Sequence, residues 1–108
     1  MAAAKPGTKV SEIANLMNAA LTDAGYGDYC RAPYMRVRGH GMGNIANQPG
    51  DVTTANHREL EEGMIFVIHP EQYLPTVGYL LVGEPVRIAA EGAVPLTARP
   101  VQLDVIGA

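Results

Sequence analysis

Hydrophobic side chains near the start of the chain recur at every third or fourth position, which is typical of one face of a helix. These positions are Val10, Ile13, Leu16, Met17, Ala20, Leu21 and Ala24. Thr8 stands where an N-cap is expected, and Gly25 stands where a helix would end. We therefore predict one amphipathic helix that packs on a sheet.

After this helix the spacing of the hydrophobic residues changes. Between 34 and 38, polar and apolar residues alternate, which predicts a strand that ends at His40. The segment 44–58 is rich in Asn, Pro, Gly, Asp and Thr, which favours a loop.

The second half of the chain contains several short apolar runs. The run 64–68 predicts a strand that is buried on both faces. A strand pair is expected over 78–82 and 86–89, and a short last strand over 94–97. The tail 98–108 is expected to return as a strand or to run as an extended strap. These elements predict the α+β class, with a curved antiparallel sheet and one long helix packed on its convex side.

Length and composition fit a single domain over 1–108. Of the 108 residues, 47% are hydrophobic and 18% are charged, which is an ordinary globular balance. No apolar run approaches the roughly 18 residues needed to span a membrane. The net charge is −3, and the chain lacks the extended Lys and Arg patches of a nucleic-acid-binding protein. We therefore expect neither a membrane nor a nucleic acid as partner.

One cysteine and one arginine cluster complete this survey. Cys30 is the single cysteine, so an internal disulfide is excluded and a cytoplasmic location is expected. Cys30 is interpreted as a packed residue and not as a nucleophile. Arg31, Arg36 and Arg38 form a local cluster that fits a solvated strand face or, alternatively, a binding site for a substrate carboxylate.

The segment Gly39–Gly43, with sequence GHGMG, contains the best candidate for chemistry. Glycine tolerates conformations and close approaches that a Cβ would block, so a histidine between glycines indicates a site with close walls. Farther along, the segment Leu60–Pro70 combines a Leu-x-x-Gly-Met turn with an apolar strand and a terminal His-Pro.

These two segments, with Pro-Gly before the helix, resemble the C-terminal half of the pita-bread domain of creatinase, aminopeptidase P and prolidase, members of the M24 metallopeptidase family. The resemblance covers about Pro6 to Thr97. It implies a two-metal hydrolase that cleaves a peptide bond involving proline. Two aspartates from the first half of the domain, and one histidine and two glutamates from the second, hold a pair of Mn²⁺ or similar ions in that family.

The resemblance can be carried over position by position. It places His40 at the ligand histidine and Asn47 at a second histidine that binds substrate or shuttles a proton. It places His69 at the first ligand glutamate and Gly83 at the bridging glutamate. Glu84 is displaced by one residue, so in a regular strand its side chain points to the opposite face.

The expected sites follow from these matches. We predict His40 and His69 as metal ligands and Asn47 as a substrate-binding residue, because an amide forms hydrogen bonds but carries no proton at neutral pH. We assign no catalytic residue, and we expect no cofactor to stay bound to this chain alone. His40 and His69 can also be interpreted as structural histidines, and His57 as a solvated one.

The expected function is therefore that of a fragment of an Xaa-Pro peptidase-like or creatinase-like protein, inactive as an isolated chain. The implied partners are a proline-containing peptide or a small amide substrate, and either the missing N-terminal half or a second copy in a homodimer. In such a dimer, His40 and His69 from two chains would converge. The alternatives are a non-catalytic binding or self-assembly module and part of a metal-independent, creatinase-like hydrolase.

Overall fold

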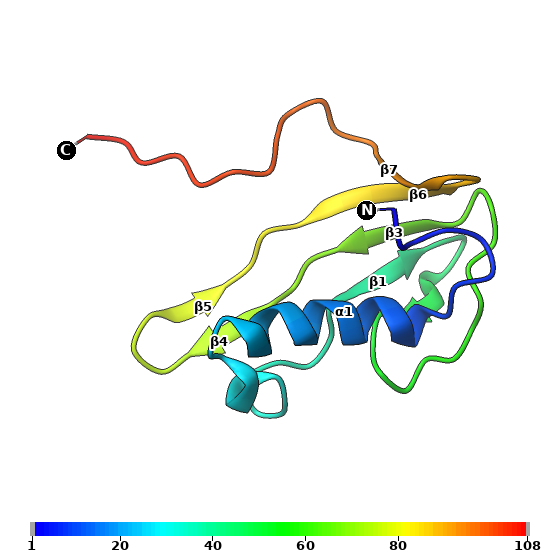
Figure 1. The fold of residues 1–108 in the computed structure, drawn as a ribbon. Helices are drawn as coiled ribbons and strands as arrows, with labels where there is room; N and C mark the ends of the chain where they lie inside the picture. The colour runs from blue at the N-terminus through cyan, green and yellow to red at the C-terminus, as the bar shows by residue number, and fades with distance from the viewer. Residues whose placement is uncertain (1, 108) are drawn as a thin grey trace.

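A computed structural model describes residues 2–107, apart from the side chains of Ala46 and Asn47 (Figure 1). One helix, α1 (Val10–Asp23), lies on one side of a five-stranded antiparallel sheet. The sheet has the order β2 (Ala46–Asp51), β1 (Gly39–Met42), β3 (Ile65–Ile68), β6 (Glu84–Ala89) and β7 (Gly92–Pro95). The predicted α+β class, an antiparallel sheet with one helix, is confirmed.

Two smaller elements lie at one end of the molecule. A short 3-10 helix, η1 (Gly27–Tyr29), follows α1. The strands β4 (Gln72–Leu74) and β5 (Gly78–Leu80) form a separate hairpin that extends beyond the main sheet (Figure 1). None of the helices in residues 2–107 is long and apolar enough to cross a membrane.

The N-cap of α1 lies one residue later than predicted. The Thr8 hydroxyl donates to the Ala3 carbonyl, so the prediction that Thr8 caps the helix is wrong. Lys9 is the N-cap, and its amide donates to the Glu12 carboxylate at 3.3 Å. This contact gives a hydrogen-bond partner to the backbone amide of the N-cap residue.

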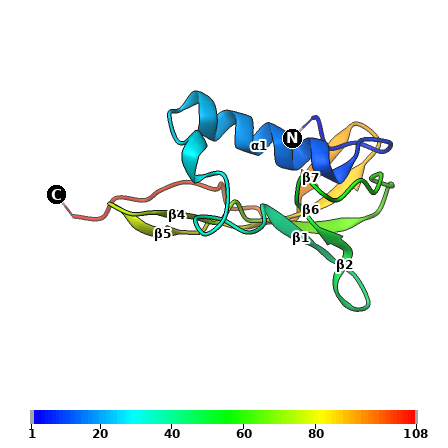
Figure 2. The same cartoon turned by 90° about the horizontal axis from the view of Figure 1, so that it is seen from below.

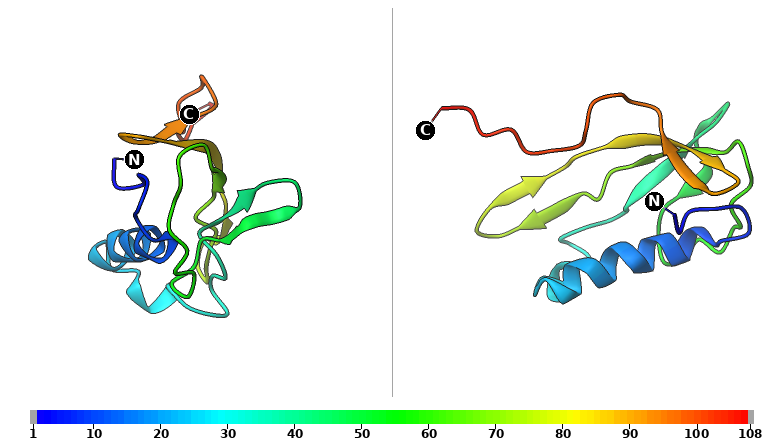
Figure 3. Two further views of the ribbon diagram at one scale, coloured as in Figure 1. Left: turned by 90° about the vertical axis from the view of Figure 1, so that its right-hand side faces the viewer. Right: turned by 45° about the horizontal axis from the view of Figure 1, so that its top comes forward.

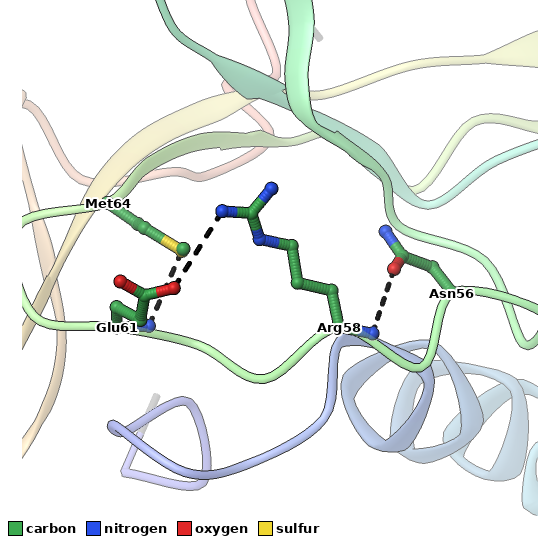
Figure 4. Close-up of polar contacts among 4 residues, drawn as sticks. All are labelled: Asn56, Arg58, Glu61 and Met64. Carbon is green, nitrogen blue, oxygen red and sulfur yellow. Dashed lines mark hydrogen bonds and ion pairs between the residues drawn. The ribbon is translucent and has the colours of Figure 1, made fainter.

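Carbonyl groups of the loop 56–64 accept hydrogen bonds from the next backbone amides of the helix. The carbonyls of Arg58 and Asn56 accept hydrogen bonds from the amides of Val10 and Ser11. Figure 4 shows how this loop is held: the Asn56 amide oxygen accepts from the Arg58 backbone, and Arg58 pairs with Glu61 at 3.7 Å. The Glu61 amide also contacts the sulfur of Met64. The helix start is therefore tied to the loop before β3.

Gly25 ends α1, as predicted. Gly25 has φ +88°, a conformation that glycine adopts without steric cost. Its amide donates to the Thr22 carbonyl at 2.9 Å, and the Tyr26 amide donates to the Leu21 carbonyl at 2.8 Å. This pair of hydrogen bonds is the Schellman motif, which ends a helix.

The core lies between α1 and one face of the sheet. Phe66 pairs with Val86 across β3 and β6, so their side chains share that face. Both are buried, as are Val10 and Ala14 of the helix. The other face of β3, with Ile65, is only half-buried. The prediction that β3 is buried on both faces is therefore wrong, because the helix covers one face alone.

Two predicted segments before β3 differ in the structure. Residues 34–38 form turns and bends, with the Arg31 carbonyl accepting from the amides of Tyr34 and Met35, and the strand begins only at Gly39. The expected loop 44–58 contains β2, which pairs with β1 as a hairpin bent away from the helix (Figure 2).

The C-terminal part also pairs differently from the prediction. Strand β5 pairs with the unpredicted β4 and not with β6. The segment 98–107 contains no strand and leaves β7 as an extended strap, which was one of the two predicted forms (Figure 3).

Candidate functional site

Two glycines let β1 fit closely between its neighbours. Gly39 has φ +150°, and a Cβ there would collide with the carbonyl of Val67. A Cβ at Gly41 would collide with the backbone joining Gln48 and Pro49. The close approach of backbones that these glycines predict is thus observed, since β3 and β2 come near β1 at Gly39 and Gly41, on either side of His40 in the chain.

His40 and His69 lie on the sheet face opposite α1. His40 pairs with Val67 across β1 and β3, so their side chains share a face. His69 follows Val67 by two residues and returns to the same side. The ring centres of His40 and His69 are 5.0 Å apart, with 63° between the ring planes. One chain brings the two histidines together, whereas the sequence analysis considered their convergence only between the two chains of a dimer.

The two imidazoles differ in their hydrogen bonds. The Nδ1 of His40 lies 3.0 Å from the Gly41 carbonyl, which identifies Nδ1 as the protonated nitrogen and leaves the lone pair on Nε2. The Nδ1 of His69 is buried and has no hydrogen-bond partner among the described residues. A purely structural role therefore accounts for the hydrogen bond of His40 but not for the unpaired Nδ1 of His69.

Position 83 belongs to the same face. A Cβ built on Gly83 would lie 3.4 Å from Cβ of His69 and 3.6 Å from Cγ1 of Val67, which are ordinary contacts. We call His40, Val67, His69 and Gly83 together the histidine face. The three positions matched to ligands of the M24 family in the second half thus converge in this chain.

Glu84 points away from the histidine face. It pairs with Ile68 across β3 and β6, which places its carboxylate on the side of the core. Its oxygens accept the Thr97 hydroxyl at 2.7 and 2.8 Å, and the side chain is buried. The opposite orientation expected from the one-residue displacement is confirmed, so Glu84 does not replace the missing carboxylate at 83.

The donors on the histidine face do not fit a bridged pair of metal ions. Such a pair needs a carboxylate that binds both cations, and this face offers two imidazoles and a glycine. Within residues 2–107, no group of three His, Cys, Asp or Glu side chains could hold a metal ion. The side chain of Asn47 lies outside the described residues, so its substrate-binding role stays a prediction.

Arg38 forms a second polar centre that the sequence analysis missed. Its side chain is fully buried. Its Nε donates to the Asn18 amide oxygen at 2.8 Å, and its Nη1 donates to the Gln72 amide oxygen and to the Glu71 carbonyl, both at 3.1 Å. Its Nη2 lies 3.5 Å from the sulfur of Cys30. We call Asn18, Cys30, Arg38 and Gln72 the Arg38 cluster.

The Arg38 cluster corrects an expectation. Both interpretations of Arg38, a solvated residue and a substrate ligand, are wrong, because protein atoms surround its guanidinium. Burial lowers the pKa of Arg38, and the nearby Cys30 and Glu71 oppose that change. Arg31 and Arg36 are exposed, as the solvated interpretation predicts. The sequence signal for the cluster was weak: Asn18 stood on the polar face of the helix without an evident partner.

Comparisons with known proteins support the resemblance found in the sequence. The chain matches the model of metallopeptidase family M24 over residues 1–94. It is 32% identical to a putative dipeptidase of Bacillus subtilis over 96% of this chain and 28% of that protein. It is 33% identical to an Xaa-Pro dipeptidase of Lactobacillus delbrueckii subsp. lactis over 96% of this chain and 27% of that protein.

Solved structures give the same picture. A prolidase from Pyrococcus furiosus superimposes with a TM-score of 0.78 at 31% identity, over 91% of this chain and 28% of that one. The dipeptidase PepE from Mycobacterium ulcerans gives a TM-score of 0.79 at 27% identity, over 94% of this chain and 26% of that one. The predicted half of a pita-bread fold is confirmed, and the chain spans just over a quarter of the length of these relatives.

Proposed function

Because the chain belongs to metallopeptidase family M24, we propose that it supplies the C-terminal half of a pita-bread domain, as one unit over 1–108, and that it does not hydrolyse Xaa-Pro dipeptides by itself. The observation that carries this proposal is the donor set of the histidine face. A histidine and a glycine stand at the two positions that the resemblance assigns to glutamates, 69 and 83. Two neutral imidazoles do not neutralise or bridge two divalent cations.

The proposed substrate class belongs to the whole protein. The relatives include proteins named as dipeptidases and Xaa-Pro dipeptidases. We propose that the parent protein binds a proline-containing peptide or a small amide, that Asn47 helps to bind it, and that the location is cytoplasmic. The missing N-terminal half of the domain would then be the natural partner of this chain.

Hydrolysis assays test the proposal directly. The isolated chain is incubated with an Xaa-Pro dipeptide and Mn²⁺, beside the Pyrococcus furiosus prolidase as a positive control. We expect no turnover above buffer. Turnover that His40→Ala abolishes would contradict the proposal. If such turnover persisted in the presence of a chelator, it would favour a metal-independent, creatinase-like hydrolase instead.

A second candidate function is self-association of the chain. Between α1 and the sheet lies an apolar cavity of about 280 Å³, which Leu16 and Met17 line from the helix side and Phe66 and Ile88 line from the sheet side. Leu16 is 54% exposed. Apolar surface of this kind favours burial against a partner, and we propose that a second copy covers it in the isolated chain.

Light scattering tests this candidate. We expect a dimer mass that Leu16→Glu reduces to the monomer mass. Leu103→Glu serves as the control, because Leu103 lies in the extended tail and is 90% exposed. A monomer at every concentration of the unaltered chain would rule out self-association.

A further inference from the structure

We infer that the backbone of residues 79–83 is a docking surface for the chain's own C-terminal strap, residues 98–107, which pairs with it reversibly as a continuation of β7. We call residues 79–83 the open edge. In the structure the strap runs along the same side of the molecule as β6 and β5 but forms no strand with them (Figure 1 and Figure 3).

The open edge belongs to one long, interrupted hairpin. The β3–β6 pair ends with Ile68 opposite Glu84, and four residues farther along each strand Gln72 lies opposite Leu80, so β4 and β5 continue the same register. The hairpin is therefore longer than the five-stranded sheet, and β7 covers only part of its outer side.

The backbone groups of the open edge point away from β4. The Tyr73 amide donates to the Tyr34 carbonyl at 2.8 Å, on the side away from β5, so the opposite residue Tyr79 also directs its amide and carbonyl outward. Alternation along the strand gives Leu81 and Gly83 the same direction. The amides of Leu81 and Gly83 have no hydrogen-bond partner among residues 2–107. An unpaired edge of this kind accepts another strand.

Strand β7 already leads into the open edge. Beyond the last paired residue of β7, the Leu96 amide donates to the Pro85 carbonyl at 2.9 Å. Thr97 then lies level with Glu84, whose carboxylate accepts the Thr97 hydroxyl at 2.7 and 2.8 Å. The strap thus leaves the sheet only after Thr97, where the open edge begins.

The side chains of the strap match those of the open edge. Continuing the register of β7 places Val101 opposite Leu80 and Arg99 opposite Val82, on one face of the sheet. Leu80, Val82 and Val101 are 46%, 55% and 57% exposed in the structure. A cavity of about 510 Å³, lined in part by Val82 and Val101, separates the strap from the sheet. Pairing would close this cavity and remove apolar surface from water.

Two features oppose the pairing and make it reversible. Pro100 would lie opposite Leu81 without an amide hydrogen to donate, although the sheet already contains the same arrangement where Pro85 lies opposite Leu96. Arg99 forms an exposed ion pair with Asp104, and a strand would place these two side chains on opposite faces. Because an exposed ion pair contributes little stability, Asp104→Asn should favour docking.

Nuclear magnetic resonance of the full chain tests the docking. Leu80 and Val101 would form a non-hydrogen-bonded pair, with Cα atoms about 4.5 Å apart, so we expect a nuclear Overhauser contact between their Hα atoms. We expect Val101→Glu to remove this contact and to speed hydrogen exchange at Leu81 and Gly83 about fivefold. Gln102→Glu is the matched control, because the same charge would point to the opposite face, and it should keep both signals.

A mixture of isotope-labelled and unlabelled chains separates docking within one chain from strand exchange between two. We expect the contact between Leu80 and Val101 within a chain only, and we expect it to persist in Leu16→Glu, whatever the mass of the unaltered chain. A contact between chains alone would overturn the inference. So would its absence from both the unaltered chain and Asp104→Asn, or equal effects of Val101→Glu and Gln102→Glu.

Discussion

The Arg38 cluster and the histidine face are two polar regions of one small chain, and they differ in how completely their groups are paired. Arg38 is fully buried, and its Nε, Nη1 and Nη2 all contact protein acceptors. On the histidine face, Nδ1 of His69 is buried without a partner among residues 2–107. A buried polar group that is fully hydrogen-bonded helps to hold a fold together, whereas a buried nitrogen without a partner costs free energy.

The same contrast appears between neighbours on the chain. Glu84 is buried, and its carboxylate is held by Thr97 on the core side. Gly83 lies beside His69, and a Cβ built on it would make only ordinary contacts. Glu84 therefore contributes to the packing of the core side, and position 83, on the histidine face, has no donor.

The largest expected effect comes from breaking the Arg38 cluster. Arg38→Met leaves the amide oxygens of half-buried Asn18 and buried Gln72 without their donor. It should lower the free energy of unfolding by about 3 kcal/mol. Arg36→Met, at an exposed neighbour, should change it by less than about 0.5 kcal/mol. Urea unfolding measures both, and equal losses in the two variants would contradict a structural role for the cluster.

A smaller loss is expected at the glycines around the histidine face. Gly41→Ala places a Cβ against the backbone of Gln48 and Pro49, and overpacking of this kind costs about 1–3 kcal/mol. Gly83→Ala is the matched control, because its Cβ has room and should cost less than about 0.5 kcal/mol. Thermal unfolding compares them. A Gly83→Ala variant as unstable as Gly41→Ala would contradict the fit of a Cβ at position 83.

The smallest effect concerns Glu71, which is close to both regions. The Tyr79 hydroxyl donates to its carboxylate at 2.6 Å and is the main reason that the pKa of Glu71 lies below its usual 4.5. A lowered carboxyl pKa stabilises the fold above that usual value, and the gain is lost as the pH falls through the lowered pKa. Tyr79→Phe should therefore be slightly less stable than the unaltered chain at neutral pH.

This difference should shrink on acidification. Urea unfolding at neutral pH and at about pH 3 measures it. A stability gap between the Tyr79→Phe variant and the unaltered chain that widened in acid would contradict the assigned cause.

Sequence reasoning succeeded where a local rule applies. The end of α1 follows from Gly25, because a positive φ at this position favours glycine. The opposite orientations of positions 83 and 84 follow from the alternation of side chains along a strand. The narrow approach around His40 follows from its flanking glycines.

Sequence reasoning failed where distant segments decide the outcome. The groups that accept hydrogen bonds from Arg38 come from α1, from β4 and from the residue after η1. No local sequence pattern brings these three segments together. Strand β2 contains Pro and Gly, which favoured a loop, yet pairing with β1 forms a strand there. The meeting of His40 and His69 within one chain depends on the pairing of β1 with β3, which the sequence does not specify.

The chain has the fold of the C-terminal half of a pita-bread domain but lacks the glutamates at 69 and 83 that would bind manganese. A Mn²⁺ titration followed by electron paramagnetic resonance tests this claim most directly. The unaltered chain is compared with His69→Glu/Gly83→Glu, with His69→Gln/Gly83→Gln as the uncharged control. We expect the free Mn²⁺ signal to stay undiminished with the unaltered chain and the control, and to fall by one equivalent with the double-glutamate variant, because carboxylates suit Mn²⁺. A fall of two equivalents with the unaltered chain would contradict the claim.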